Sequence, residues 1–92
     1  IYKIAVPGFA VTTVATTLSA DLLAMMPNGD LLTGGAAAIY RVTQAGVITT
    51  AFTGFEQVRG IAYDPTLKRL FIIDHSATVG TPDKLHIRPL DN

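Results

Sequence analysis

The sequence predicts an all-β fold that is built from two copies of one repeat, and three observations lead to this prediction. Displaced by 38 positions, residues 1–27 align with residues 39–65 without a gap. Within each copy, short runs rich in Thr, Val, Ile and Leu alternate with turn sequences. The 92 residues are 49% apolar, which suits a packed core. The identical pairs in the alignment are Ile1 and Ile39, Tyr2 and Tyr40, Gly8 and Gly46, Thr12 and Thr50, Ala24 and Ala62, and Pro27 and Pro65.

The strands of the first copy follow from its β-branched runs and from the turns between them. Thr, Val and Ile suit a pleated, half-buried surface. Pro27-Asn28-Gly29-Asp30 is a tight turn, because Pro presets φ at its position and Gly supplies a positive φ. The strands expected here are Ile1–Ile4, Val11–Thr17, Leu22–Met26, Asp30–Thr33 and Ile39–Val42.

The strands of the second copy are placed by the same alignment. One inserted residue after Pro65 matches Leu31-Leu32 with Leu70-Phe71, and a further insertion of seven residues matches Ile39–Val42 with Leu85–Arg88. The strands expected in this copy are Val47–Thr53, Gly60–Tyr63, Arg69–Ile73 and Leu85–Arg88. Ile1–Ile4 is then an additional copy of the fourth strand.

One segment also fits a helix. Leu18, Leu22, Met25 and Met26 follow a helical spacing, and Ser19 is a suitable N-cap. The equivalent segment in the second copy contains Gly60 and lacks this apolar stripe. A strand is therefore expected over Leu22–Met26, with a short helix over Ser19–Met26 as the alternative.

Four short strands in every 38–46 residues is the period of a β-propeller blade. The expected architecture is two four-stranded antiparallel blades in one segment over residues 1–92, with repeat units at about 8–42 and 46–90. Residues 1–4 add one extra outer strand. A β-sandwich with a fortuitous repeat is the alternative fold.

The second copy also resembles a known repeat. Gly60-Ile61-Ala62-Tyr63-Asp64-Pro65, followed by Arg69-Leu70-Phe71-Ile72-Ile73-Asp74, resembles the NHL-type blade, whose usual form is Gly-Ile-Ala-Val-Asp-Pro, a turn, an apolar strand and Asp. Residues 22–33 resemble it less closely. The resemblance implies a propeller of the NHL and gluconolactonase-like group, and it implies no single activity because propellers host many.

Two blades do not close a propeller, which needs about four to eight. The chain is therefore expected either to be a piece of a longer propeller or to close a ring with further copies of itself. The extra strand Ile1–Ile4 favours the first possibility, because a ring of complete blades leaves one fourth strand redundant. A start at Ile1 instead of Met also fits a processed product or a fragment.

Composition excludes several classes of function. Seven Lys and Arg balance seven Asp and Glu, which argues against a nucleic-acid partner, since that needs a basic face. The chain has no Cys, so thiolate chemistry and Cys-ligated zinc are excluded. No apolar run reaches the roughly 20 residues of a membrane helix, which predicts a soluble chain without a membrane span. The compartment is not indicated, and export fits.

The long loops predict where ligands bind. The antiparallel order places the loop between the first and second strands of a unit at the same edge as the loop between the third and fourth strands. Long loops on one edge of a rigid scaffold commonly carry binding residues. The candidates gathered there are Asp21, Glu56, Gln57, Arg59, Asp74, His75, Thr81 and Asp83.

Asp74-His75 is the sharpest of these features, because it ends an apolar strand and opens the longest loop. A carboxylate beside an imidazole suits a general base, a metal site or a pH-sensitive contact. In the structural interpretation, which we favour, Asp74 caps backbone amides of the loop and His75 is an exposed turn residue. His86 is expected to be exposed on the polar side of its strand.

A short segment is similar to the paraoxonases. Arg59-Gly60-Ile61 and Leu70-Phe71-Ile72-Ile73-Asp74-His75 resemble the pattern His-Gly-Ile, apolar strand, Asn-His of that family, in which two His form a catalytic dyad above calcium. The resemblance places the second His at His75, the catalytic candidate. It places the first at Arg59, which is always protonated, so the dyad is broken.

Calcium takes about six to eight oxygen ligands. Asp21, Asp74 and Glu56 are candidate contributors, although two blades do not complete such a site and ion pairing or capping explains these carboxylates as well. The expected function is thus a non-catalytic scaffold or recognition segment without a cofactor. Part of a calcium-dependent lactonase or esterase is the first alternative, and an oligomeric carbohydrate-binding propeller is the second.

Overall fold

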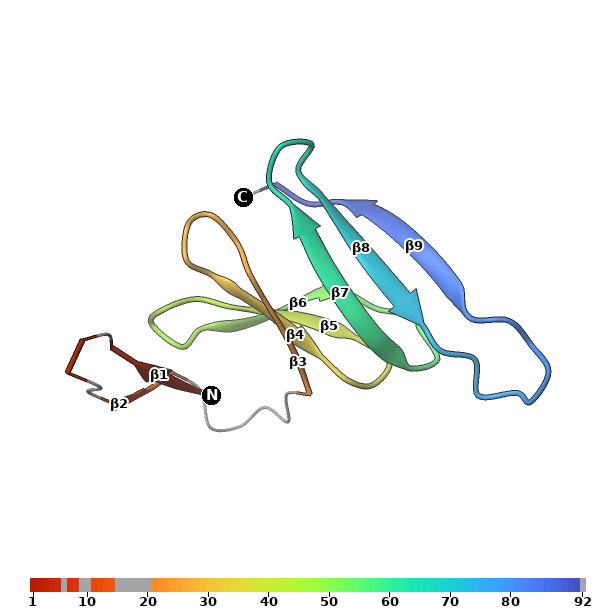
Figure 1. Ribbon diagram of the computed structural model, residues 1–92, viewed down its shortest axis with the longest axis horizontal. Coiled ribbons are helices and arrows are strands. Elements are labelled where there is room, and N and C mark those ends of the chain that lie inside the picture. Colours follow the sequence, from red (N-terminus) through yellow and green to blue (C-terminus); the bar gives the residue numbers. More distant parts are fainter. Residues whose placement is uncertain (6, 9–10, 15–20, 92) are drawn as a thin grey trace.

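The computed structural model describes residues 1–5, 7–8, 11–14 and 21–91, and this part of the chain is all-β. It contains nine strands and no helix (Figure 1). Accordingly, the described residues hold no helix that is long and apolar enough to cross a membrane. The strands are β1 (Tyr2–Ile4), β2 (Val11–Thr13), β3 (Leu22–Met25), β4 (Leu31–Gly34), β5 (Ile39–Val42), β6 (Ile48–Phe52), β7 (Val58–Asp64), β8 (Arg69–Asp74) and β9 (Lys84–Pro89).

Each strand expected from the sequence has a counterpart in the structure, with ends that differ by one or two residues where they are described. Leu22–Met25 forms a strand, so the helical alternative is wrong for these residues, while Ser19 lies outside the described part. The expected tight turn is confirmed, because the Met26 amide bonds to the Asp30 carbonyl at 2.8 Å and Gly29 has φ of 92°. Residues 15–17 of the expected strand Val11–Thr17 also lie outside the described residues.

The strands group into three antiparallel sheets, which are β1-β2, β3-β4-β5-β6 and β7-β8-β9. The expectation of two four-stranded sheets is therefore wrong for the described residues, in which the second large sheet has three strands. Each expected unit was to begin with the strand now seen as β2 or β6. Instead, β6 completes the sheet of β5, and β1 pairs with β2. The physical reason is connection length, because a short turn joins these strands into hairpins.

The strand registers reproduce the repeat alignment of the sequence. Leu22 pairs with Gly34 in β3–β4, and their equivalents Gly60 and Ile73 pair in β7–β8. Thr33 pairs with Tyr40 in β4–β5. Their equivalents, Ile72 and His86, pair in β8–β9. The hairpin β1–β2 resembles β5–β6, but its register is shifted by one residue relative to the alignment. Tyr2 pairs with Thr13, whereas Tyr40 pairs with Thr50, the equivalent of Thr12. The two copies are thus the same structural unit.

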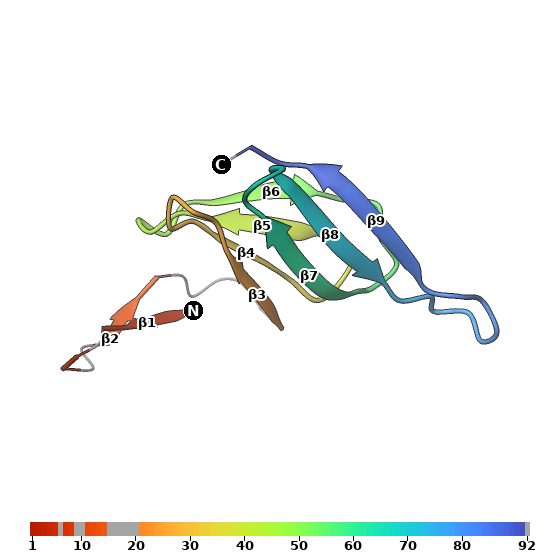
Figure 2. The ribbon, with the colours of Figure 1, turned by 45° about the horizontal axis from the view of Figure 1, so that its top comes forward.

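The hydrophobic core lies between the two larger sheets. The strands β3 and β7 lie side by side, and the sheets fan out from them (Figures 1 and 2). One face of β3–β6 contributes Leu32 and Ile39, and one face of β7–β9 contributes Leu70 and Ile72, all four fully buried. Removing this apolar surface from water holds the sheets together.

Each larger sheet also has an apolar face that the other sheet does not cover. On β3–β4 this face carries Leu23, Met25 and Leu31, and we name it the N-terminal open face. It borders a cavity of about 440 Å³ beside the β1–β2 hairpin. The C-terminal open face, on β7–β9, carries Ala62, Phe71, Ile73, Leu85 and Ile87. The described chain measures 48 × 28 × 23 Å, with the N-terminal hairpin extending its long axis.

Candidate functional site

The long loops meet at one edge of the two sheets, at the bottom of Figure 1. The amides of Phe55 and Val58 donate to the carbonyls of Ala37 and Ala36 at 3.2 and 2.9 Å, which joins the loop after β6 to the loop after β4. The His75 amide donates to the Gln57 carbonyl at 2.8 Å and joins that loop to the one after β8. We name residue 21 and residues 34–38, 53–59 and 74–84 the loop edge. These loops lie together at one edge, which confirms the position that the antiparallel strand order predicted for them.

Asp74 is the buried acidic residue of the loop edge, at the end of β8. Its Oδ1 accepts hydrogen bonds from the backbone N–H groups of Glu56 and Gln57, both at 3.0 Å. Burial raises the pKa of Asp74, but these two donors and the neighbouring His86 outweigh it, and the pKa lies below its ordinary value. The expected capping of loop amides by Asp74 is confirmed, and the carboxylate fastens a loop that lies 17 residues earlier in the chain.

His86 was expected to be exposed, and this expectation is wrong. It lies opposite Ile72 in the register of β8–β9, so its ring points toward the core side of the sheet and is half-buried. The ring stands edge-on to Phe55, with 5.3 Å between centroids. Its Nε2 lies 3.4 Å from Oδ2 of Asp74. Leu85 and Ile87 face outward instead. β9 thus places a polar residue toward the core and apolar residues toward solvent, the reverse of an ordinary exposed strand.

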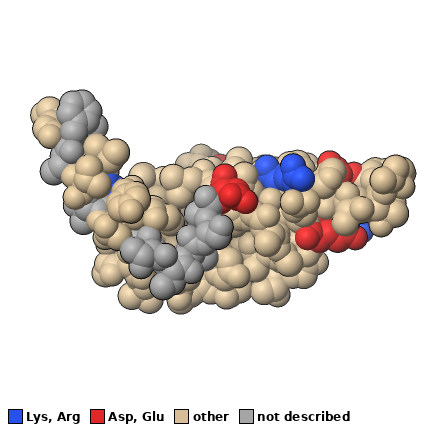
Figure 3. All heavy atoms as spheres, turned by 90° about the horizontal axis from the view of Figure 1, so that it is seen from below, with Lys and Arg blue, Asp and Glu red and all other residues tan. Residues whose placement is uncertain are grey.

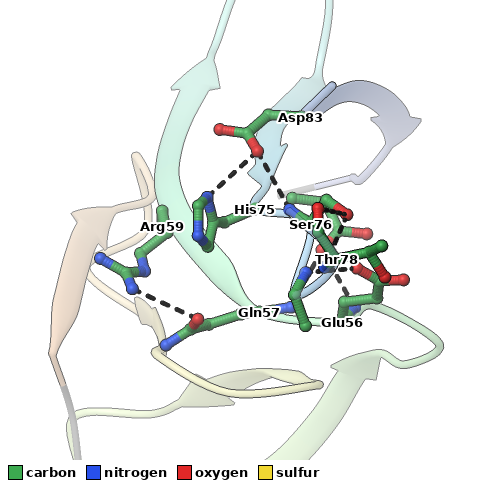
Figure 4. Close-up of polar contacts among 9 residues, drawn as sticks. Glu56, Gln57, Arg59, His75, Ser76, Thr78 and Asp83 are labelled. Carbon is green, nitrogen blue, oxygen red and sulfur yellow. Dashed lines mark hydrogen bonds and ion pairs between the residues drawn. The ribbon is translucent and has the colours of Figure 1, made fainter. Parts of the chain in front are cut away.

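His75 contacts a different carboxylate. Its Nδ1 lies 3.0 Å from Oδ1 of Asp83, and both side chains are nearly half exposed (Figure 4). Asp83 Oδ1 also accepts a hydrogen bond from the Ser76 amide at 3.0 Å. The pKa of Asp83 is lowered, first by the Ser76 amide and then by His75. The pair closes the base of the loop at residues 76–82, and His75 is not a freely exposed turn residue.

The remaining candidates lie around this loop. Glu56 turns away from His75, and its Oε2 accepts a hydrogen bond from the Ala77 amide at 2.8 Å. Arg59 is exposed on the side of the loop away from Glu56, and its Nη2 donates to Oε1 of Gln57 at 3.3 Å (Figure 4). Thr81 is exposed, and its amide donates to the Thr78 carbonyl at 3.2 Å.

Asp21 belongs to another part of the loop edge. Its amide donates to the Gly34 carbonyl at 3.0 Å, and its side chain is exposed. The structure thus brings Glu56 together with Asp74 and His75 together with Asp83, whereas Asp21 binds to the loop after β4. Among the residues that the structure describes, no group of three or more His, Asp or Glu is placed to hold a metal ion.

The loop edge carries charges of both signs. Seen from below, small basic and acidic groups alternate on a surface that is otherwise without charge (Figure 3). Such a surface has no single-sign field to attract a polyanion or polycation. Most of its carboxylates are occupied by backbone amides, so its chemistry is that of a polar, hydrogen-bonding rim with Arg59 as an exposed cation.

Comparisons of the chain with protein-family models, with curated proteins and with solved structures found no significant match.

Proposed function

We propose that the chain is a two-blade segment of a β-propeller, which acts as a scaffold and presents the loop edge as its recognition surface. The repeated register is the observation that carries this proposal. Two sheets with the same strand pairing lie face to face with their first strands, β3 and β7, side by side. Blades of a propeller are repeated around a centre in this manner.

The NHL-like motif residues have structural roles that fit a blade. Asp64 Oδ1 accepts hydrogen bonds from the amides of Thr66 and Leu67 at 3.0 and 3.3 Å, and so caps the turn between β7 and β8. Asp74 caps the loop that enters β7. The two Asp residues of the motif therefore fix the two ends of one strand hairpin, which explains their spacing without a catalytic role.

Recognition is assigned to the loop edge because its backbone is held firmly while several polar groups remain exposed. The opposite edge consists of tight turns, which project few side chains. At the loop edge, Arg59 and the His75–Asp83 pair face solvent on one side of the loop after β8 (Figure 4). A rigid backbone with exposed hydrogen-bonding groups suits a polar ligand.

Amide chemical-shift mapping tests this function. Oligosaccharides, short peptides and Ca²⁺ would be added in separate titrations to the chain and to two variants, Arg59→Ala at the loop edge and Thr66→Ala at the opposite edge. We expect a polar ligand to shift the amides around Arg59, His75 and Asp83. We expect Arg59→Ala to weaken that response and Thr66→Ala to leave it unchanged.

The other outcomes decide between the alternatives. Shifts confined to the turns around Thr66 would contradict recognition by the loop edge, and the absence of any shift would leave the scaffold role alone. Calcium-dependent hydrolysis of a lactone would replace the proposal by the lactonase alternative. Binding of oligosaccharides alone would favour the carbohydrate-binding alternative.

A further inference from the structure

The two open faces consist mostly of apolar residues, as the buried faces do, but the other sheet does not cover them. Ile39 on β5 is 0% exposed, whereas its repeat equivalent Leu85 on β9 is 57% exposed. Tyr63 on β7 is half-buried, whereas its equivalent Met25 on β3 is 69% exposed. Large apolar side chains are thus exposed where the stack of sheets ends. Such patches commonly mark interaction surfaces.

The interface inside the chain shows what these faces fit. On one side of it, β3–β6 contributes Leu22, Ala24, Leu32 and Ile39. Their repeat equivalents are Gly60, Ala62, Phe71 and Leu85, which belong to the C-terminal open face or border it. The C-terminal open face therefore has the same strand register, and a similarly apolar character, as the face of β3–β6 that packs against β7–β9.

The other side of the same interface leads to the N-terminal open face. There, β7–β9 contributes Ile61, Tyr63, Leu70 and Ile72. Their equivalents are Leu23, Met25, Leu31 and Thr33, three of which form the N-terminal open face. One chain thus carries both halves of a second interface of the kind that joins its own sheets, and it carries them at opposite ends.

We propose that the C-terminal open face of one copy of this chain binds the N-terminal open face of a second copy, and that this head-to-tail contact repeats. It rests on the proposed function, because it assumes that the two sheets are propeller blades. A contact between unlike faces forms a ring when its rotation closes. Since propellers have about four to eight blades, a closed ring holds two to four copies. The net charge of zero removes long-range repulsion between them.

The β1–β2 hairpin shows how the contact is completed. β1 is a copy of the same strand as β9 and occupies, beside β2, the place that corresponds to β9 of a neighbouring copy. The free edge of β9 therefore pairs with β2 of the second copy and displaces β1. Because β9 takes the place of β1, the register of β1–β2 predicts Arg88 opposite Val11, Ile87 opposite Thr12 and His86 opposite Thr13. The additional strand Ile1–Ile4 then pairs with β2 only in the single chain, and β9 of another copy replaces it on assembly.

Two charged substitutions test the proposal. Ile73→Lys places an ammonium group on the C-terminal open face, and Met25→Lys places one on the N-terminal open face. Val79→Lys is the matched control, because Val79 is fully exposed in the loop after β8 and belongs to neither face. Burying an unpaired charge in an apolar contact is costly, and we expect each face variant to weaken association by about a hundredfold or more.

The readout is the solution mass by light scattering. We expect the wild-type chain and Val79→Lys to form a species of two to four copies of 9.7 kDa, and each face variant alone to be a folded monomer. A 1:1 mixture of the two face variants retains one intact pair of faces and is expected to form a dimer. That recovery also shows that both variants are folded. Amide exchange in β9 is expected to slow on association, while exchange in β1 becomes faster.

Each other outcome contradicts head-to-tail pairing. A folded wild-type monomer at high concentration, a mixture that stays monomeric, or a face variant that still dimerises alone would overturn it. Aggregation that neither substitution relieves would overturn it as well. A folded monomer that still shows ligand shifts at the loop edge would overturn this inference and leave the proposed recognition function standing, so the two failures are distinguishable.

Discussion

Replacing Asp74 by Ala tests whether this carboxylate holds the loop edge together. Its Oδ1 accepts two backbone hydrogen bonds, from Glu56 and Gln57, each 3.0 Å long. Hydrogen bonds to a charged group contribute about 1.5–3 kcal/mol each. Glu56 is exposed, so water replaces part of the loss at its amide. The lower end of the range applies, and we expect Asp74→Ala to reduce the free energy of unfolding by about 3 kcal/mol.

The matched control is Asp64→Ala at the opposite edge. Asp64 also accepts two amide hydrogen bonds, at 3.0 and 3.3 Å, but they come from its own turn, two and three residues away. A local cap of this kind contributes about 1 kcal/mol, by analogy with helix caps. Asp74 instead joins segments 17 and 18 residues apart, so its loss releases a whole loop from the end of β8.

Urea unfolding monitored by circular dichroism measures the difference. With a slope of about 1–2 kcal/mol/M for a small domain, a loss of about 3 kcal/mol lowers the midpoint by about 1.5–3 M. All variants are compared at one protein concentration, because association shifts the midpoint. If Asp74→Ala destabilises the chain no more than Asp64→Ala does, the carboxylate does not fasten the loop edge and our interpretation of its contacts is wrong.

Three further measurements test the fold. Folding lowers the pKa of Asp74 below its ordinary value of 3.8, so the unfolded chain binds more protons than the folded chain. The ionised Asp74 carboxylate therefore contributes stability that is complete above about pH 5 and is lost as the pH falls through the folded-state pKa. A pH titration of the stability of Asp74→Asn should lack this contribution. Leu70→Ala removes a fully buried side chain of the core and should cost about 2–5 kcal/mol in urea unfolding, whereas Leu67→Ala, at an exposed position, should change stability by less than about 0.5 kcal/mol. Tyr63→Phe removes the hydrogen bond of 2.7 Å to the Leu90 carbonyl and should cost about 1 kcal/mol, with faster amide exchange near Leu90 as a second readout.

The sequence predicts the strand positions well because they depend on local signals, and the registers of the larger sheets follow from the same signals. The Pro27–Asp30 turn fixes how β3 meets β4, and the alignment of two copies transfers that register to β7 and β8. A register is strongly specified where one face is buried, because a slip of one residue turns the apolar side chains outward. Leu32 and Leu70, both fully buried, show that the apolar pattern was sufficient here.

The grouping of strands into sheets was not predictable from the repeat alone. A periodic sequence does not mark where one unit ends, and β6 fits the end of one sheet as well as the start of the next. Connection length decides, since five residues separate β5 from β6 and a hairpin forms. This signal was present in the sequence and would have indicated that β1 and β2 pair as well.

The candidate site was predictable in its location and not in its contacts. The antiparallel order alone places the long loops at one edge. Which carboxylate faces which partner depends on side-chain direction, and Asp74 and Asp83, close in the sequence, bind different segments. His86 was missed because alternation was interpreted as an ordinary exposed strand, whereas its register with Ile72 turns it inward.

The inversion on β9 connects the site to the open faces. A strand at the end of a stack normally places polar residues toward water, but here His86 faces inward, where Asp74 and Phe55 contact it, while Leu85 and Ile87 face outward. Burying a polar group is tolerated when a partner is present, whereas two exposed large apolar residues on one strand gain nothing from solvent. The arrangement is explained if β9 is an interior strand of a longer stack, with the C-terminal open face covered by another sheet. The same residue pattern therefore supports both the structural role of the loop edge and the proposed contact of the C-terminal open face with a further sheet.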